Sequence, residues 1–363
     1  MAGLKVYVYA ICKNEERFAE RWYESMKEAD GVYVLDTGST DGTVDLLRRL
    51  GAQVESQTIS PWRFDVARNR SLEAVPEDAD ICVCTDLDEV FQAGWREKME
   101  RAWSGNVRML RYRYTWSFNP DGSEGYVFWI EKAHARKGFR WVNPVHEVLK
   151  CDSDYETGQA QGVQLDHFPD GQKSRAQYLP LLEQAVAEDP ENDRNMHYLG
   201  REYMYRGDWG ECIQTLERHL KLPAANWADE RAASMRYLAR ANQALLRTQQ
   251  AEKWHLMSVA EAPHLRETWL DYAAWLLENG HHEGVVFAVK RALEITERPQ
   301  SYISESESWG AKPYDLISVA LYYTGRYEEA LVFADKALAL LPDDERIIAN
   351  RDFILQRLTP DKR

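Results

Sequence analysis

The sequence contains no apolar run of the length, about 18 or more residues, that a membrane-spanning helix needs. The segment from Met1 to Cys12 also lacks the basic region, the long hydrophobic stretch and the small-residue cleavage site of a signal peptide. We therefore interpret the apolar run from Val6 to Cys12 as a first strand. Together these absences predict a cytoplasmic protein without a membrane span.

Cysteine is scarce, and its five copies form neither an even set nor a pattern of zinc-ligand spacing. Cys82 and Cys84 alternate along one short apolar run, where a buried structural role is the simplest interpretation. An odd number of cysteines inside apolar runs fits a reducing compartment and argues against a disulfide framework.

An excess of positive charge is also missing. The 363 residues carry a formal net charge of −14, and neither half of the chain is basic. An acidic surface repels nucleic-acid phosphates and anionic lipid, so we expect no nucleic-acid partner and no binding to a membrane surface.

The first half alternates short β-branched or aromatic runs with amphipathic stretches of helical length. This alternation predicts a mostly parallel, Rossmann-like sheet covered by helices on both faces. Ligands of such sheets bind at the carboxyl ends of the strands. The expected strands are 5–10, 32–35, 52–55 and 81–85, and the expected helices are 15–29, 43–50 and 64–74.

From about Ala176 the strand signals end and helix follows helix, with glycine, alanine, aromatic residues and proline recurring at a period of about 34 residues. This period and residue order are those of tetratricopeptide repeats. We count four repeats, of which 230–263 is degenerate, and interpret 297–312 as an insertion loop. The predicted domains are therefore 1–175, an α/β domain, and 176–363, an all-α repeat solenoid.

Two carboxylates, Asp86 and Asp88, follow the apolar strand 81–85 directly. Buried carboxylates are costly unless a cation neutralises them, and hard oxygen ligands suit Mg²⁺ or Mn²⁺. A cation there would bridge a diphosphate leaving group. The alternative is a solvated turn that caps a helix.

A second strand end, 34–43, reads Val-Leu-Asp-Thr-Gly-Ser-Thr-Asp-Gly-Thr. Gly38 permits a tight turn, and the hydroxyl and carboxylate side chains after it are good caps for the next helix. Asp36 is then available to accept a hydrogen bond from a nucleobase, unless it only forms the turn.

These motifs resemble the family 2 glycosyltransferases of the GT-A fold over about residues 4–170, and the layout with trailing repeats is similar to sublancin-type peptide S-glycosyltransferases and lipopolysaccharide-core transferases. The resemblance lies in 13–16, 35–43, 62–69 and 86–88. It implies a nucleotide-sugar pocket and a divalent cation, Mn²⁺ or Mg²⁺. The pocket would be lined by Asn14, Glu15, Asp36, Arg68 and Asp86. The metal ligands would be Asp88 and His167. For His167, a contact with the phosphates or a purely structural role also stays open.

An inverting transfer needs a base near the acceptor atom, and our candidate is Glu147 in the segment Asn-Pro-Val-His-Glu. The alternative is that Glu147 pairs with Lys150 or Arg140 and only supports the fold; the base would then be Asp166 or Asp65.

The sequence thus predicts a hexosyltransferase that moves one sugar from a nucleoside-diphosphate sugar, a UDP-sugar by preference, to a peptide, protein or glycan acceptor. Single transfer follows from the absence of the Gln-x-x-Arg-Trp signature of processive relatives. Two other functions stay open: an inactive domain on a repeat scaffold that binds partner proteins, and a sugar nucleotidyltransferase. A homodimer through the repeats is also left open.

Overall fold

The computed structural model describes residues 3–119, 122–171 and 177–359, which form two compact units, Met1–Glu188 and Asp189–Arg363. The first unit is an α/β structure, and the second is built from helices alone. The first unit also includes helix α5 (Tyr178–Glu188). The division of the chain at residue 175 stays a prediction.

One mixed sheet of eight strands forms the centre of the first unit, in the order β3-β2-β1-β4-β7-β6-β10-β5. The first four strands are parallel, as the alternating pattern predicts. In the other half β6 and β10 are parallel, whereas β7 and β5 run antiparallel to their neighbours. The strands are β1 (Val6–Cys12), β2 (Gly31–Asp36), β3 (Gln53–Ser56), β4 (Ile81–Thr85), β5 (Glu89–Phe91), β6 (Val107–Thr115), β7 (Val127–His134) and β10 (Glu156–His167); a separate hairpin pairs β8 (Phe139–Val142) with β9 (Val148–Cys151).

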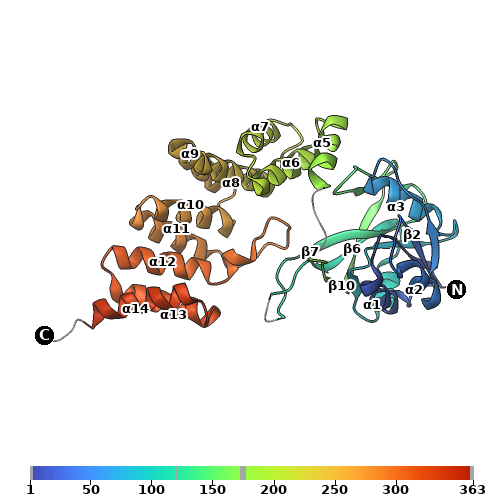
Figure 1. Cartoon of the computed structure of the whole chain (residues 1–363), viewed down its shortest axis with the longest axis horizontal. Helices are drawn as coiled ribbons and strands as arrows, with labels where there is room; N and C mark the ends of the chain where they lie inside the picture. Colours follow the sequence, from blue (N-terminus) through green and yellow to red (C-terminus); the bar gives the residue numbers. More distant parts are fainter. Residues whose placement is uncertain (1–2, 120–121, 172–176, 360–363) are drawn as a thin grey trace. The chain divides into compact units, whose positions relative to one another are not determined.

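Helices cover both faces of the sheet (Figure 1). One face packs against α1 (Glu16–Met26), α2 (Thr43–Leu50) and α4 (Trp95–Ala102), whose buried Trp22, Leu47 and Trp95 belong to one apolar core with side chains of β1 and β4. On the other face a smaller cluster joins α3 (Phe64–Glu73) to Tyr9 of β1 and to the hairpin. The loops after β1, β2 and β4 thus lie between two packed layers, at one edge of a rigid sheet.

The parallel pairing fixes which loops meet. Cys12, the last residue of β1, pairs with Asp36, the last residue of β2, and Ala10 pairs with Thr85 at the end of β4. The indole N–H of Trp22 donates to the Thr85 hydroxyl at 3.0 Å, which ties α1 to the end of β4. Because the three strands end together, the polar residues that follow them are gathered at one edge.

The second unit consists of antiparallel helix pairs that follow one another along the chain (Figure 1). The segment between α11 and α12 is an irregular connection with one short 3₁₀ helix, Ser306–Trp309, which confirms the insertion predicted at 297–312. Four pairs and a final helix make a tetratricopeptide-repeat solenoid: α6 (Asp193–Arg206) with α7 (Trp209–His219), α8 (Ala228–Ala244) with α9 (Thr248–Glu261), α10 (Arg266–Glu278) with α11 (His282–Glu294), α12 (Lys312–Tyr323) with α13 (Tyr327–Leu340), and α14 (Glu345–Leu358).

Gly200 allows α6 and α7 to cross closely, because a Cβ atom there would lie only 2.2 Å from Cδ2 of the buried Leu216. We expect Gly200→Ala to lower the free energy of unfolding by about 1–3 kcal/mol through overpacking. The matched control is Gly210→Ala in α7, where a Cβ meets no atom within 4 Å and the higher helix propensity of alanine is expected to stabilise. Chemical denaturation measures both; equal effects of the two substitutions would contradict the close crossing.

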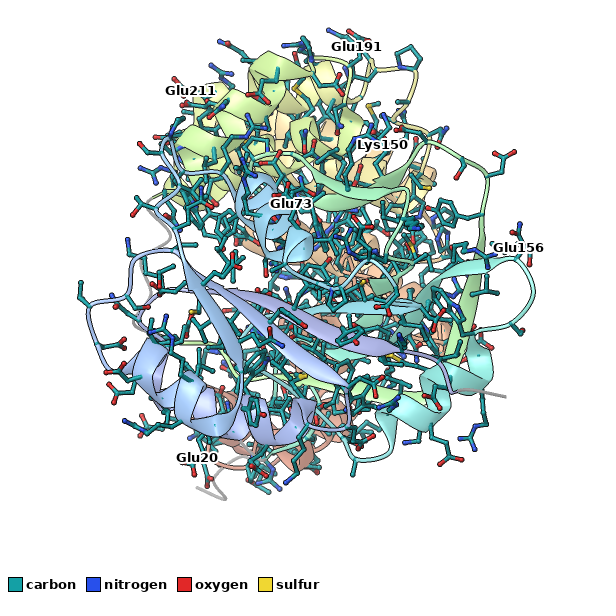
Figure 2. The ribbon with its side chains drawn as sticks, turned by 90° about the vertical axis from the view of Figure 1, so that its right-hand side faces the viewer. Glu20, Glu73, Lys150, Glu156, Glu191 and Glu211 are labelled. Carbon is teal, nitrogen blue, oxygen red and sulfur yellow. The ribbon has the colours of Figure 1, made fainter. Side chains whose placement is uncertain are left out.

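Part of the acidic character of the chain lies on its surface. Figure 2 shows carboxylates such as Glu20, Glu73 and Glu156 on the outside of the first unit, where all three are exposed. No helix in the described residues is long and apolar enough to cross a membrane.

Candidate active site

The loops after β1 and β2 are held together by side chains of the predicted nucleotide pocket. Asn14, in a left-handed backbone conformation with φ 56°, donates its N–H to the Ser39 hydroxyl at 2.8 Å. Its side-chain oxygen accepts the N–H of Thr40 at 2.7 Å. The two loops therefore form one hydrogen-bonded unit at the edge of the sheet.

Asp36 is buried, and its carboxylate accepts the N–H of Ser39 at 3.0 Å and that of Gly38 at 3.3 Å. Asp36 therefore has the turn-forming role that the sequence left open. Its pairing with a nucleobase stays a prediction.

Glu15 stands at the start of α1 and is also buried. Its N–H donates to the Thr43 hydroxyl at 2.8 Å, which joins the starts of α1 and α2. Both helices thus begin at the same edge of the sheet, where the Asp41 carboxylate accepts the N–H of Glu16 at 3.3 Å and that of Thr43 at 3.1 Å.

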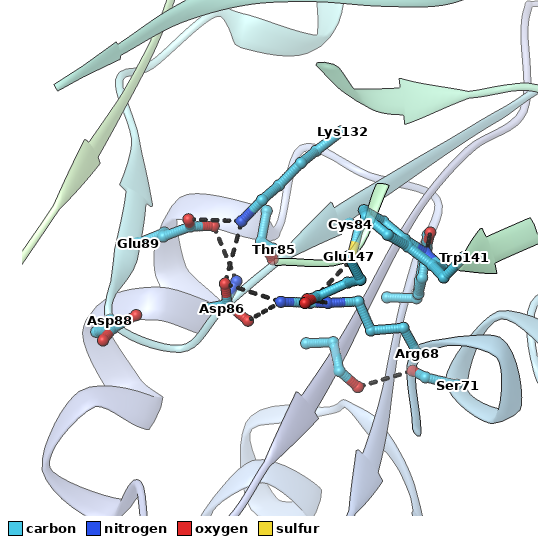
Figure 3. A network of polar contacts seen from close by, with 12 residues as sticks. Arg68, Ser71, Cys84, Thr85, Asp86, Asp88, Glu89, Lys132, Trp141 and Glu147 are labelled. Carbon is cyan, nitrogen blue, oxygen red and sulfur yellow. Dashed lines mark hydrogen bonds and ion pairs between the residues drawn. The ribbon is translucent and has the colours of Figure 1, made fainter. Parts of the chain in front are cut away.

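Arg68 is the centre of a buried charge network (Figure 3). Its Nη2 donates to both oxygens of Asp86, at 3.0 and 3.2 Å, and its Nε pairs with Glu147. The guanidinium also lies 5.2 Å from the ring centre of Trp141. The structure thus brings together Arg68, Asp86 and Glu147, which stand far apart in the sequence.

Lys132 on β7 completes this network and was not among the residues selected from the sequence. Its Nζ donates to Asp86 at 3.1 Å and to Glu89 at 2.8 Å (Figure 3). Glu89 also accepts the hydroxyl of Tyr114 at 2.8 Å and the N–H of Asp86 at 2.9 Å. The only sign of Lys132 in the sequence is its place inside the aromatic run 127–134. A lysine in such a run usually lies on a solvated face of a strand.

The charged side chains of this network determine which of its members are ionised. Burial by itself would raise the pKa of Asp86, but Arg68 and Lys132 outweigh it and hold that pKa well below the usual range. Burial likewise opposes the charged form of Lys132, yet the two carboxylates raise its pKa above the usual value. For Glu89, burial dominates and raises the pKa. Asp86 is therefore an ionised carboxylate whose charge is already compensated by protein cations.

Asp88 lies apart from this network in Figure 3 and faces His167 at the end of β10. Its Oδ2 is 3.4 Å from Nε2 of His167, and Nδ1 of the same ring is 2.9 Å from the carbonyl oxygen of Trp116. The N–H of Phe168 donates to the Asp88 carbonyl at 2.8 Å, which holds the two segments side by side. Within the described residues no arginine or lysine contacts the Asp88 carboxylate.

These donors fit a divalent cation. Neighbouring ligands of an octahedral Mg²⁺-type ion with bonds of about 2.0–2.1 Å lie about 3 Å apart, close to the 3.4 Å between the Asp88 and His167 atoms. The contact of Nδ1 with a backbone carbonyl is the second-sphere bond that directs Nε2 of a ligating histidine. Asp88 and His167 can therefore hold the ion, whereas Asp86 is committed to Arg68 and Lys132.

Glu147 follows the first strand of the hairpin, and only about a tenth of its side chain is exposed. The cation that it contacts is Arg68, not Lys150 or Arg140; the latter pairs with Asp152. The alternative bases are also engaged, since Asp65 accepts two hydrogen bonds from Arg63 and Asp166 accepts one from Gln92. The contact with Arg68 joins Glu147 to the predicted nucleotide pocket.

An open cavity of about 740 Å³ lies next to His167. Arg21 lies over the ring of Phe168 at 4.3 Å, and Phe118 stacks on that ring at 5.3 Å. The cavity thus combines cationic and aromatic surfaces beside the Asp88–His167 pair; it is lined by Arg17, Phe18, Arg21, Ser117, Phe118, His167, Phe168, Pro169, Asp170 and Gly171.

Residues 7–140 match the model of Glycosyl transferase family 2. This segment is therefore similar to the family 2 glycosyltransferases. The matched segment contains Asp36, Arg68, Asp86 and Asp88 of the candidate site, while Glu147 and His167 lie beyond it.

A curated relative, an uncharacterized glycosyltransferase of Rickettsia bellii (strain RML369-C), is 33% identical over 97 residues. That match covers 26% of this chain and 32% of the relative, so the chain spans about a third of the relative's length.

Among solved structures, the TPR protein YrrB is 16% identical, with a TM-score of 0.38, over 48% of this chain and 82% of its own. A thermophilic TPR protein of Thermus thermophilus is 18% identical, with a TM-score of 0.36, over 49% of this chain and 88% of its own. These likenesses are weak; the helix pairs and their close crossings are what identify the repeats in the second unit.

Proposed function

We propose that this chain is an inverting, non-processive, metal-dependent glycosyltransferase that moves one sugar from a nucleoside-diphosphate sugar, by preference a UDP-sugar, to a peptide, protein or glycan. The observation that carries the proposal is the facing pair of Asp88 and His167 at the edge of the sheet of a family 2 domain. This pair supports binding of the donor's diphosphate through Mn²⁺ or Mg²⁺.

The buried network supports the donor pocket. Arg68 and Lys132 neutralise Asp86, so Asp86 is a fixed hydrogen-bond acceptor that is suited to a ribose hydroxyl. The loops tied by Asn14, and the nearby starts of α1 and α2, would lie along the nucleotide. Because each group is already fixed by its partners, little ordering is needed when the donor binds.

In the proposed reaction a hydroxyl or thiol of the acceptor attacks the anomeric carbon from the side opposite the diphosphate. A divalent cation bound at Asp88 and His167 would neutralise the charge that develops on the leaving group. As the new bond forms, the bond from the anomeric carbon to the diphosphate oxygen breaks and its electron pair stays on that oxygen. Glu147 accepts the proton of the nucleophile, which balances the step.

The second unit supports an extended acceptor. Repeat solenoids present long concave surfaces, which suit a peptide or another elongated chain. The acceptor is therefore proposed to be a peptide or protein, with a glycan as the other class.

A donor screen tests the proposal without knowledge of the acceptor. The purified chain is incubated with Mn²⁺ and a panel of UDP-, GDP-, CDP- and TDP-sugars, and formation of the nucleoside diphosphate is followed by chromatography. We expect slow hydrolysis of a UDP-sugar above the protein-free rate. Release of pyrophosphate from a nucleoside triphosphate and a sugar phosphate would instead indicate a nucleotidyltransferase.

A further inference from the structure

A second group of metal-ligand side chains lies in the helical unit, away from the residues assigned to sugar transfer. His197 on α6, His219 at the end of α7 and Glu230 on α8 place one ligand atom each within 4.8 Å of the other two. Both histidines are fully buried, and Glu230 is 5% exposed. The first helix pair and the helix that follows it thus converge on a polar centre inside an apolar core.

The hydrogen bonds of the two histidines leave the same atom of each ring without a partner. Nδ1 of His197 is 2.8 Å from the Ser234 hydroxyl oxygen, and Nδ1 of His219 is 3.0 Å from it. Nε2 of both rings has no hydrogen-bond partner in the described part of the chain. A buried polar atom without a partner is destabilising, so two in one cluster need an explanation.

Ser234 can accept from both rings at once. A hydroxyl oxygen has two lone pairs, so it can take the N–H of both Nδ1 atoms. Each ring then carries its lone pair on Nε2, the atom that binds metals. A shared second-sphere acceptor of this kind fixes the tautomer and the orientation of ligating imidazoles.

Glu230 supplies the negative charge. One of its oxygens accepts the Tyr302 hydroxyl, and Oε1 lies 3.4 Å from Nε2 of His219, without hydrogen-bond geometry. Its carboxylate is thus held by Tyr302 beside the ring of His219.

We propose that His197, His219 and Glu230 bind a divalent first-row transition metal ion, with Zn²⁺ as the best match, which fastens α6, α7 and α8 together. Two imidazoles and one carboxylate are an established ligand set for Zn²⁺, with one position left for water. Ligands of a tetrahedral Zn²⁺ ion with bonds of about 2.0–2.1 Å lie about 3.4 Å apart, and the His219–Glu230 atoms already have this separation. The ion would be separate from the cation proposed at Asp88 and His167.

Metal analysis of the full-length protein tests this site. The protein is loaded with Zn²⁺, dialysed against a weak competing chelator and measured by inductively coupled plasma mass spectrometry. To remove the other site, the measurement uses the Asp88→Asn background. We expect one tightly held equivalent of Zn²⁺ and a higher melting temperature than after removal of the ion by a strong chelator.

His219→Gln is expected to lose this equivalent and its thermal stabilisation by Zn²⁺. The matched control is His255→Gln in α9, which removes another buried histidine whose ring nitrogens have no hydrogen-bond partner among the described residues. The control variant is expected to retain the ion. Loss of Zn²⁺ from both variants alike, or no stoichiometric Zn²⁺ in the parent, would overturn the proposal.

A measurement without a substitution in the cluster covers the case in which His219→Gln does not fold. Co²⁺ is added to the metal-free protein in the same Asp88→Asn background, and its visible absorption is recorded. A tetrahedral site of imidazole and carboxylate ligands gives intense visible bands that added Zn²⁺ removes. The weak spectrum of hydrated Co²⁺, unchanged by protein, would mean that the cluster is only a hydrogen-bonded core.

Discussion

Asp88→Asn is expected to abolish metal-dependent binding of UDP while leaving the fold nearly intact. The amide has the shape of the carboxylate but lacks the charge that a hard divalent cation requires. Substitutions in the second sphere of metal sites already cost about 10–100-fold in affinity, so loss of the charged ligand itself should exceed that range. Isothermal titration calorimetry with UDP in the presence of Mn²⁺ measures the effect.

The matched control is Asp45→Asn, which makes the same change of charge at an exposed position of α2. This variant is expected to bind UDP and Mn²⁺ like the parent. If Asp88→Asn binds them equally well, the cation site is elsewhere and the Asp88–His167 contact is only structural.

Glu147→Gln is expected to lower the rate of sugar transfer by about 10²–10⁴-fold, with little change in the affinity for UDP. Glutamine keeps an oxygen that can accept the Nε hydrogen of Arg68, so the donor pocket should stay in place. It cannot take the proton of the acceptor. The transfer rate per folded molecule and the UDP affinity are measured together.

The outcomes separate two roles of Glu147. A loss of UDP affinity as large as the loss of rate would show that Glu147 positions Arg68 and is not the base. A near-parental rate with earlier melting would leave it a purely structural partner of Arg68. Glu188→Gln is the matched control, because Glu188 also pairs with an arginine, Arg63, but at the surface of the same unit.

Local signals in the sequence predicted the first half of the sheet closely. The helix Thr43–Leu50 and the strand Ile81–Thr85 have the predicted bounds. The helix ends at Gly51, which has a left-handed backbone conformation with φ 111°. A glycine in this position commonly ends a helix, so the end can be predicted from the sequence. The other half of the sheet was not predicted, because β7, β6, β10 and β5 are paired across long stretches of chain and in both directions.

Local sequence patterns likewise predicted only part of the candidate active site. Motifs of a few residues selected Asp36, Asp86 and Asp88, which lie at strand ends where local pattern is informative. The partners of these residues come from far away: Lys132 reaches Asp86 from β7, and Arg68 meets Glu147 across 79 positions. Only the folded sheet brings such pairs together.

The proposed function requires that a cation held by Asp88 and His167 activates a nucleotide sugar. The most direct test is the rate at which the full-length protein releases UDP from a UDP-sugar, first with Mn²⁺, then with EDTA in excess, and finally after Mn²⁺ is restored. We predict release above the protein-free rate with Mn²⁺, loss of that release with EDTA, and recovery when the ion returns. Release that is equal with and without the ion, or absent for every nucleotide sugar tested, would contradict the claim.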